Sequence, residues 1–134
     1  MRIAVIDGQG GGIGRTLVEK LRQTYGAEVT IVALGTNAMA TALMLRAGAD
    51  EGASGENAIC HNADQVDVIL GPMGILCANA LMGELTPAMA RAIGESRARK
   101  ILVPVSRCRV FVAGLGSMTI PQYIEDAVAL VTKV

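Results

Sequence analysis

The segment VIDGQGGGIGRTLVEKL, residues 5–21, constrains the fold of this chain most. An apolar run leads into five glycines within the seven positions 8–14, and a stretch with apolar residues at helical spacing follows. A strand, a glycine-rich turn and a helix in this order aim the free backbone amides of the turn, and the positive end of the helix, at one point. Glycine also lacks the Cβ atom that would keep a ligand away from the backbone. The segment therefore predicts a site for an anion, and we expect a phosphate group.

Strand and helix patterns alternate along the whole chain, which predicts an α/β fold. We expect a Rossmann-like three-layer sandwich with a mainly parallel sheet, formed by residues 1–134 as a single domain. The expected strands are 2–6, 29–34, 51–53, 66–70, 100–105 and 110–113. The expected helices are 13–25, a helix from the cap Asn37 to Gly48, 55–63 with Ser54 as the cap, one from Pro72 through Leu81, one from Pro87 to about Ser96, and a last helix that opens at a capping box of Thr119 and Gln122 and buries Ile124, Val128 and Val131.

The connection between the last two expected strands is unusually short. Only four residues, 106–109, separate them, and a parallel crossover needs many more. We therefore expect a C-terminal antiparallel hairpin whose turn lies at the same sheet edge as the glycine loop. Arg107 and Arg109 in this turn either meet an anionic ligand or are simply solvated.

Of two common nucleotide-binding motifs, the first does not fit the glycine loop and the second fits it poorly. The pattern GxGxxG places Ile13 or Arg15 at its last glycine, and GxxxxGK[ST] places Gln9 at its first glycine and Arg15 at its lysine. The loop Gly8-x-x-x-Gly12-Ile13-Gly14-Arg15 resembles instead the GxxxGxG loop of the short-chain dehydrogenase/reductase superfamily, over about residues 2–36.

This resemblance implies a pyrophosphate held by Gly8, Gly12 and Gly14, with residues 9–11 near the adenosine. The superfamily's Tyr-x-x-x-Lys pair has no counterpart, because Val29 stands four places after Tyr25 and Ala127 four places after Tyr123. The binding loop is therefore carried over without the reductase activity. The whole chain also resembles an uncharacterised family of small bacterial proteins that open with VIDGQGGGIG and carry GPxGI and RC segments later, which implies fold and boundaries only.

The end of the second expected strand bears on the choice of nucleotide. An NAD site usually has an acid there to hold the ribose, but residues 34–37 read Leu-Gly-Thr-Asn. NADP is therefore slightly favoured over NAD, and a mononucleotide or another phosphorylated ligand stays open. Asp7 would repel a phosphate unless it is paired, for example with Arg15, or binds a metal or a ribose hydroxyl.

Ligands of open α/β sheets bind at the carboxyl ends of the strands, and the predicted site follows that edge. The segment 71–74 either forms a second wall of this site or is a plain turn with a proline at its start. The predicted binding residues are Gly8, Gln9, Gly10, Gly11, Gly12, Ile13, Gly14, Arg15, Gly35, Thr36, Asn37, Gly71, Pro72 and Arg107.

No metal site and no catalytic group are expected from the remaining reactive residues. Cys60, His61, Cys77 and Cys108 show no CxxC spacing, and His61 falls at the sheet edge away from the loop. Five methionines are expected to fill a core or a subunit interface, namely Met39, Met44, Met73, Met82 and Met89.

Composition narrows the classes of partner. Twelve basic and twelve acidic residues give a formal net charge of zero, which argues against nucleic acid or an acidic membrane, and the apolar runs are too short and broken to span a bilayer. Three cysteines without a paired framework indicate a reducing cytoplasm, and 51% hydrophobic residues favour a homodimer. We expect a module that binds or senses a nucleotide; the alternative is a small NADP-dependent oxidoreductase completed by a partner subunit.

Overall fold

The sheet is the centre of the molecule, and all of its strands run parallel. The computed structural model describes residues 1–105 and 109–133. Its strands are β1 (Arg2–Asp7), β2 (Thr30–Gly35), β3 (Glu51–Ser54), β4 (Val68–Pro72) and β5 (Arg99–Val103). They lie in the order β3-β2-β1-β4-β5. The inner strands are almost wholly buried, as their continuous apolar runs predict for a parallel sheet covered on both faces.

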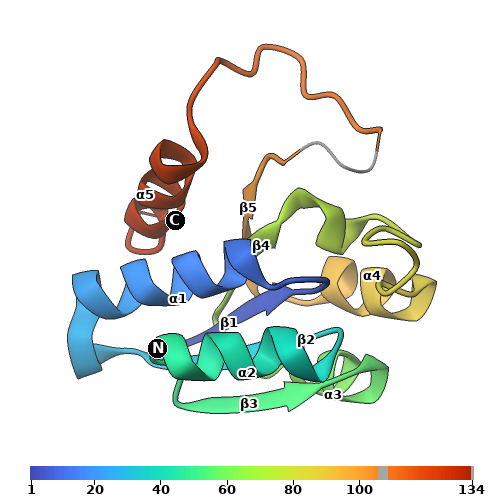
Figure 1. The fold of residues 1–134 in the computed structure, drawn as a ribbon, viewed down its shortest axis with the longest axis horizontal. Coiled ribbons are helices and arrows are strands. Elements are labelled where there is room, and N and C mark those ends of the chain that lie inside the picture. The colour runs from blue at the N-terminus through green and yellow to red at the C-terminus, as the bar shows by residue number, and fades with distance from the viewer. Residues whose placement is uncertain (106–108, 134) are drawn as a thin grey trace.

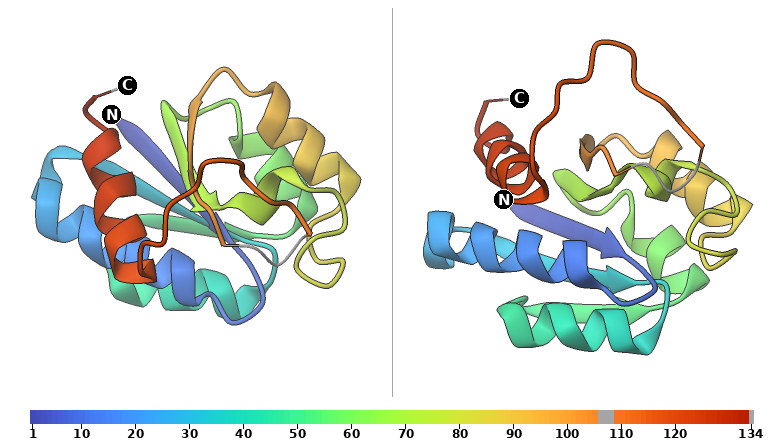
Figure 2. Two further views of the ribbon diagram at one scale, coloured as in Figure 1. Left: turned by 90° about the horizontal axis from the view of Figure 1, so that it is seen from above. Right: turned by 45° about the horizontal axis from the view of Figure 1, so that its top comes forward.

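Helices cover both faces and complete three layers (Figures 1 and 2). One face carries α1 (Gly12–Tyr25), α2 (Ala38–Ala47) and α5 (Ile120–Leu130), and the other carries α3 (Glu56–Asn62) and α4 (Pro87–Glu95). Short 3₁₀ helices η1 (Gly26–Glu28) and η2 (Met73–Leu76) follow α1 and β4. Alternate residues of each strand feed two cores: Ile3 and Val5 face α1 and α5, whereas Ala4 and Ile6 face α3 and α4.

The strand order reverses at β1. The chain builds β2 and β3 to one side of β1 and then crosses to place β4 and β5 on the other side. The loops after β1 and β4 therefore leave the same sheet edge in different directions. Ligands bind open α/β sheets at such a switch point.

Three helix starts follow the predicted capping. Asn37 accepts a hydrogen bond from the Ala40 amide at 2.8 Å, and Thr86 accepts one from the Met89 amide at 3.2 Å. At α5 the Gln122 side chain accepts the Thr119 amide at 2.8 Å. The short strand at 51–53 is also confirmed as the edge strand β3.

The predicted antiparallel hairpin is wrong. Residues 110–113 form no strand, and residues 109–119 arch away from the body of the molecule with every side chain exposed (Figures 1 and 2). Part of the predicted turn, residues 106–108, lies outside the described residues. β-branched and aromatic residues favour a strand because their side chains pack well on the surface of a half-buried sheet. Residues 110–113 have this composition but pack on no such surface, so they form no strand.

Two further predictions are corrected. Pro72 ends β4 instead of starting a helix: only the single turn of η2 follows, and then an irregular segment with left-handed backbone at Asn79, Leu81 and Met82. Ser54 does not cap α3, because its hydroxyl donates to Thr41 Oγ1 at 2.7 Å and Gly55 takes the cap position. No helix in the described residues is long and apolar enough to cross a membrane.

Candidate ligand-binding site

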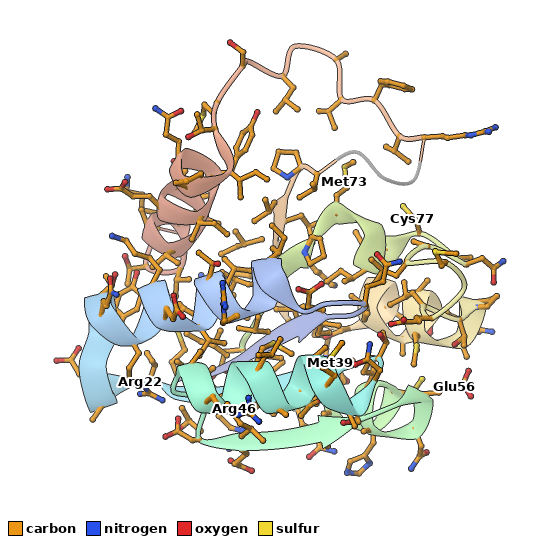
Figure 3. All side chains as sticks on the ribbon, viewed as in Figure 1. Arg22, Met39, Arg46, Glu56, Met73 and Cys77 are labelled. Atoms are coloured by element: carbon orange, nitrogen blue, oxygen red, sulfur yellow. The ribbon has the colours of Figure 1, made fainter. Side chains whose placement is uncertain are left out.

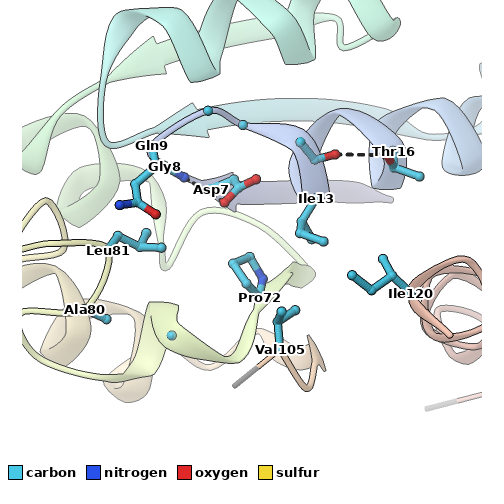
Figure 4. Close-up of a pocket in the computed structure, with 14 residues that line it drawn as sticks. Asp7, Gly8, Gln9, Ile13, Thr16, Pro72, Ala80, Leu81, Val105 and Ile120 are labelled. Carbon is cyan, nitrogen blue, oxygen red and sulfur yellow. Dashed lines mark hydrogen bonds between the residues drawn. The ribbon is translucent and has the colours of Figure 1, made fainter. Parts of the chain in front are cut away.

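A cavity of about 420 Å³ lies at the switch point, between the glycine loop and η2 (Figure 4). Backbone of the loop and the first turn of α1 form one wall. Apolar side chains of Pro72 at the end of β4, of Ala80 and Leu81 after η2, and of Val105 and Ile120 form the rest, together with Gly74 of η2. The lining residues are Asp7, Gly8, Gln9, Gly10, Gly11, Gly12, Ile13, Thr16, Pro72, Gly74, Ala80, Leu81, Val105 and Ile120.

The five loop glycines divide into two groups by the space around them. A Cβ atom at Gly8 would overlap Thr36 Oγ1, and one at Gly14 would lie 2.7 Å from Met44 Sδ. Gly11 has a φ of +71° and lies against the Ala40 backbone, so it too is required by the fold. Gly10 and Gly12 have nothing within 4 Å of such an atom. Packing therefore explains three of the glycines and leaves these two unexplained.

Most amides of the loop already have acceptors. Asp7 accepts from the Gly8 amide at 2.8 Å and from the Gly14 amide at 2.7 Å. The Gly11 amide donates to the Gly8 carbonyl at 2.9 Å. Within the described residues, no hydrogen bond is formed by the amides of Gly10, Gly12 and Ile13. Fewer loop amides are therefore free than the sequence predicts, and two of them, those of Gly12 and Ile13, lie at the start of α1.

Asp7 is held in place by backbone and not by Arg15. It is 4% exposed, and burial raises the pKa of its carboxyl, against the lowering effect of the Gly14 and Gly8 hydrogen bonds. Arg15 instead extends to Glu19, with 3.9 Å between Nε and Oε1. The pairing with Arg15, one of the alternatives that the sequence left open for Asp7, does not form, because the Gly8 and Gly14 amides are the donors to the buried carboxylate.

Glu84 joins the glycine loop to the end of β2, a contact that the sequence does not predict. Its Oε1 accepts from Thr36 Oγ1 at 2.6 Å, from the Gln9 amide at 2.8 Å and from Asn37 Nδ2 at 2.9 Å. These hydrogen bonds, led by that from Thr36, hold the pKa of Glu84 below its usual value. A carboxylate from a distant part of the chain therefore lies at the end of β2, so the absence of an acid from residues 34–37 no longer favours NADP over NAD. The only indication of this contact in the sequence was that Thr36 and Asn37 carry hydrogen-bond donors and that no acidic residue stands near them in the sequence to accept from them.

The structure brings together only part of the predicted binding set. Residues 8–13 and Pro72 line the cavity, whereas Arg107 lies outside the described residues. The other predicted residues do not line it: Gly14, Arg15, Gly35, Thr36, Asn37 and Gly71. Packing alone explains the glycine at position 71, because a Cβ atom there would overlap the Ile6 carbonyl oxygen.

Neither a metal site nor a uniform role for the methionines emerges. Among the described residues, no three His, Cys, Asp or Glu side chains gather closely enough to hold an ion. Met44 and Met89 are buried in the two cores, whereas Met39, labelled on α2 in Figure 3, is 60% exposed and Met82 is 92% exposed. A packing role in the core is confirmed for Met44 and Met89, and the alternative role in a subunit interface stays a prediction for Met39 and Met82.

Comparisons with known proteins give a family and a fold. The chain is similar to a dodecameric FMN-dependent UbiX-like decarboxylase from Escherichia coli O157:H7, with 17% identity, 96% of this chain and 75% of that chain covered, and a TM-score of 0.50. A universal stress protein solved in complex with cAMP shows 18% identity over 75% of this chain and 94% of its own, with a TM-score of 0.41. No curated protein is similar enough to count as a match.

The decarboxylase supports the α/β fold, and none of these comparisons confirms the resemblance to short-chain dehydrogenases. The family comparison covers almost the whole sequence. The model of a domain of unknown function, DUF3842, matches residues 2–134, and the chain belongs to that family.

Proposed function

We propose that this protein is a binding or sensing module for a phosphate-containing small molecule, which it holds at the amides of Gly12 and Ile13. One observation carries the proposal: Gly12 borders the cavity at the positive end of α1, its amide has no acceptor in the described residues, and nothing in the fold requires it to be glycine. A side chain at this position would fill space that a ligand needs. Gly10, two residues earlier in the loop, shows the same pattern.

The rest of the cavity favours a ligand with an apolar ring. Ile13, Pro72, Leu81, Val105 and Ile120 surround the space opposite the amides. Its volume of about 420 Å³ falls in the ordinary range for small-molecule sites. No described lining residue carries a positive charge, which favours a single phosphate over a polyphosphate. The flavin mononucleotide named for the similar decarboxylase has this chemistry and is our first probe.

The oxidoreductase alternative gains no support from the site. Asp7 is the only ionisable residue among the described lining residues, and both of its carboxylate oxygens are committed to loop amides. We therefore propose binding without assigning catalysis.

Two further expectations stay proposals. We propose a homodimer, because the uncharged segment 110–120 exposes apolar side chains that its own chain does not cover: Val110, Phe111, Val112, Leu115, Met118 and Ile120. We also propose a reducing cytoplasmic setting, because the sequence has an odd number of cysteines, three, without the spacing typical of a disulfide-rich domain.

Titration calorimetry with FMN, AMP, NAD, NADP and ATP tests the proposed function. We expect FMN or AMP to bind and Gly12→Val to weaken binding at least tenfold, because the new side chain fills the space in front of the two amides. Gly94→Val is the matched control: Gly94 lies on α4, also has open space around it, and does not line the cavity. An absence of heat with every probe, or equal losses in both variants, contradicts the proposal.

A further inference from the structure

We infer that Glu84 determines ligand specificity: it ties the glycine loop to the end of β2, so that the site accepts a mononucleotide-sized ligand extending over β4 and β5 and rejects a dinucleotide. The inference rests on the proposed function, since it names the ligand class for the same cavity. It starts from an asymmetry of the loop, which is sealed on its β2 side and open on its β4 side.

Hydrogen bonds seal the β2 side. The Glu84 carboxylate joins the Gln9 amide to Thr36 and Asn37, and Asn37 Nδ2 also donates to the Gln9 carbonyl at 3.0 Å. Both backbone polar groups of Gln9 are therefore taken by protein. Its left-handed backbone, with a φ of 47°, is fixed from both sides by these bonds. A ligand that enters here has to break this connection.

Close packing adds to the seal. A Cβ atom on Gly8 would lie 2.9 Å from Leu81 Cδ1 and 3.0 Å from Glu84 Oε1, besides overlapping Thr36. The segment that carries Glu84 thus packs directly on the first residue of the loop. The position between the ends of β1 and β2 is filled by side chains of this chain.

The opposite side is open. Gly10 and Gly12 meet nothing within 4 Å, and the cavity continues from them to Pro72 at the end of β4 and to Val105 beyond β5 (Figure 4). A phosphate at the Gly12 and Ile13 amides therefore directs the rest of its ligand over β4. In sheets that bind dinucleotides, the ribose of one nucleotide is held by an acid at the end of the second strand. Here the carboxylate of Glu84 lies at the end of β2, but its Oε1 already accepts from Thr36 Oγ1, Asn37 Nδ2 and the Gln9 amide. The hydroxyls of a ribose would have to compete with these donors for the same oxygen.

Matched pairs of probes test the inference, each pair being a mononucleotide and the dinucleotide that contains it: FMN with FAD, and AMP with NAD. In whichever pair the wild-type protein binds, it should bind the mononucleotide at least tenfold tighter than the dinucleotide. Glu84→Ala should reduce this ratio to less than about threefold. Glu84→Gln should retain most of the discrimination, because an amide oxygen can still accept from the Gln9 amide. Glu95→Ala is the control, since Glu95 is an exposed residue on α4 paired with Arg91.

A second readout requires no ligand. Hydrogen exchange at the Gln9 amide should be faster in Glu84→Ala than in wild type, while the Ala40 amide, which is bonded to Asn37, serves as an internal reference. Equal affinity of wild type for both members of a pair overturns this inference and leaves the proposed function standing. Binding of none of the four probes overturns the proposed function, and this inference falls with it.

Discussion

Gly12 and Gly14 stand two positions apart in one loop, yet their surroundings differ. A Cβ atom at Gly14 would lie 2.7 Å from Met44 Sδ and 2.8 Å from Asp7 Cβ, whereas one at Gly12 meets nothing. We expect Gly14→Ala to lower the free energy of unfolding by about 1–3 kcal/mol through overpacking. Gly12→Ala should leave it unchanged or raise it by up to about 1 kcal/mol, because alanine is the better helix former. Urea denaturation measures the free energy of unfolding of both variants. Equal losses of this free energy would contradict the conclusion that packing requires a glycine at position 14 and not at position 12.

Asp50 links three segments and makes part of the stability depend on pH. Its carboxylate accepts from the Ile31 amide at 2.8 Å and from Arg22, which reaches across from α1 (labelled in Figure 3), at 2.7 Å. The Ile31 hydrogen bond first, and then that from Arg22, lower the pKa of Asp50 below its usual value of 3.8.

A lowered pKa in the folded state means that Asp50 contributes stability fully above pH 3.8 and loses it as the pH falls through its folded pKa. Asp50→Asn should therefore cost about 1 kcal/mol at pH 7, a modest value because the site is half-exposed. The difference from wild type should shrink in acid below pH 3.8. Urea denaturation at a series of pH values measures it, and a difference that does not change with pH would be the opposing result.

Local contacts were predictable from the sequence, and distant ones were not. The cap of Asn37 on the Ala40 amide joins residues three apart, so a spacing rule finds it. Glu84 meets Gln9 across 75 positions of sequence, and no motif records such a contact. Asp7 combines the two cases. Its position beside the loop could be read from the sequence, but its bonding to loop amides instead of Arg15 depends on its burial in the fold.

At the scale of elements, the start of α5 offers a clean test of capping. Thr119 Oγ1 accepts the Gln122 amide at 3.4 Å, and the helix buries Ile124 and Val128 against the sheet. Thr119→Ala should lower the free energy of unfolding by about 1 kcal/mol, since it leaves helix donors without an acceptor. Thr132→Ala, at an exposed site beyond the helix, is the control. Thermal denaturation that fails to separate the two variants counts against the capping role.

The helices and strands were predictable where the hydrophobic periodicity and the residues that begin or end an element agree. The alternation of buried strands with capped helices identified every observed strand and the three-layer arrangement. Prediction failed at 72–81 and 110–113, where composition suggested a helix and a strand. Pro72 serves as well at the end of a strand as at a helix start, and apolar residues at 110–113 have no surface in the described chain to pack against.

At the scale of the whole molecule, the segment 109–119 stands out because it is exposed along its whole length and packs on neither core. Phe111, in this segment, is 89% exposed. If this segment packs in the proposed homodimer, the wild-type mass in light scattering should be twice the chain's 13.9 kDa. Phe111→Asp should shift it to the monomer, because it places a charge in the apolar contact.

Met39→Asp is the matched control, since Met39 is exposed on α2, away from the segment. Dissociation by Met39→Asp instead of Phe111→Asp would place the contact on another face. A wild-type protein that is monomeric at working concentration would refute the dimer.

In the proposed function, two backbone amides at the start of α1 hold the phosphate. Assigned ¹H–¹⁵N spectra recorded during a titration with FMN test it most directly, with AMP as the second probe. We predict that the amide protons of Gly12 and Ile13 move downfield to saturation, as donors to an anionic oxygen do, while the Gly14 amide, bonded to Asp7, shifts little. Saturable shifts confined to residues away from the glycine loop, or none with either probe, would contradict the account.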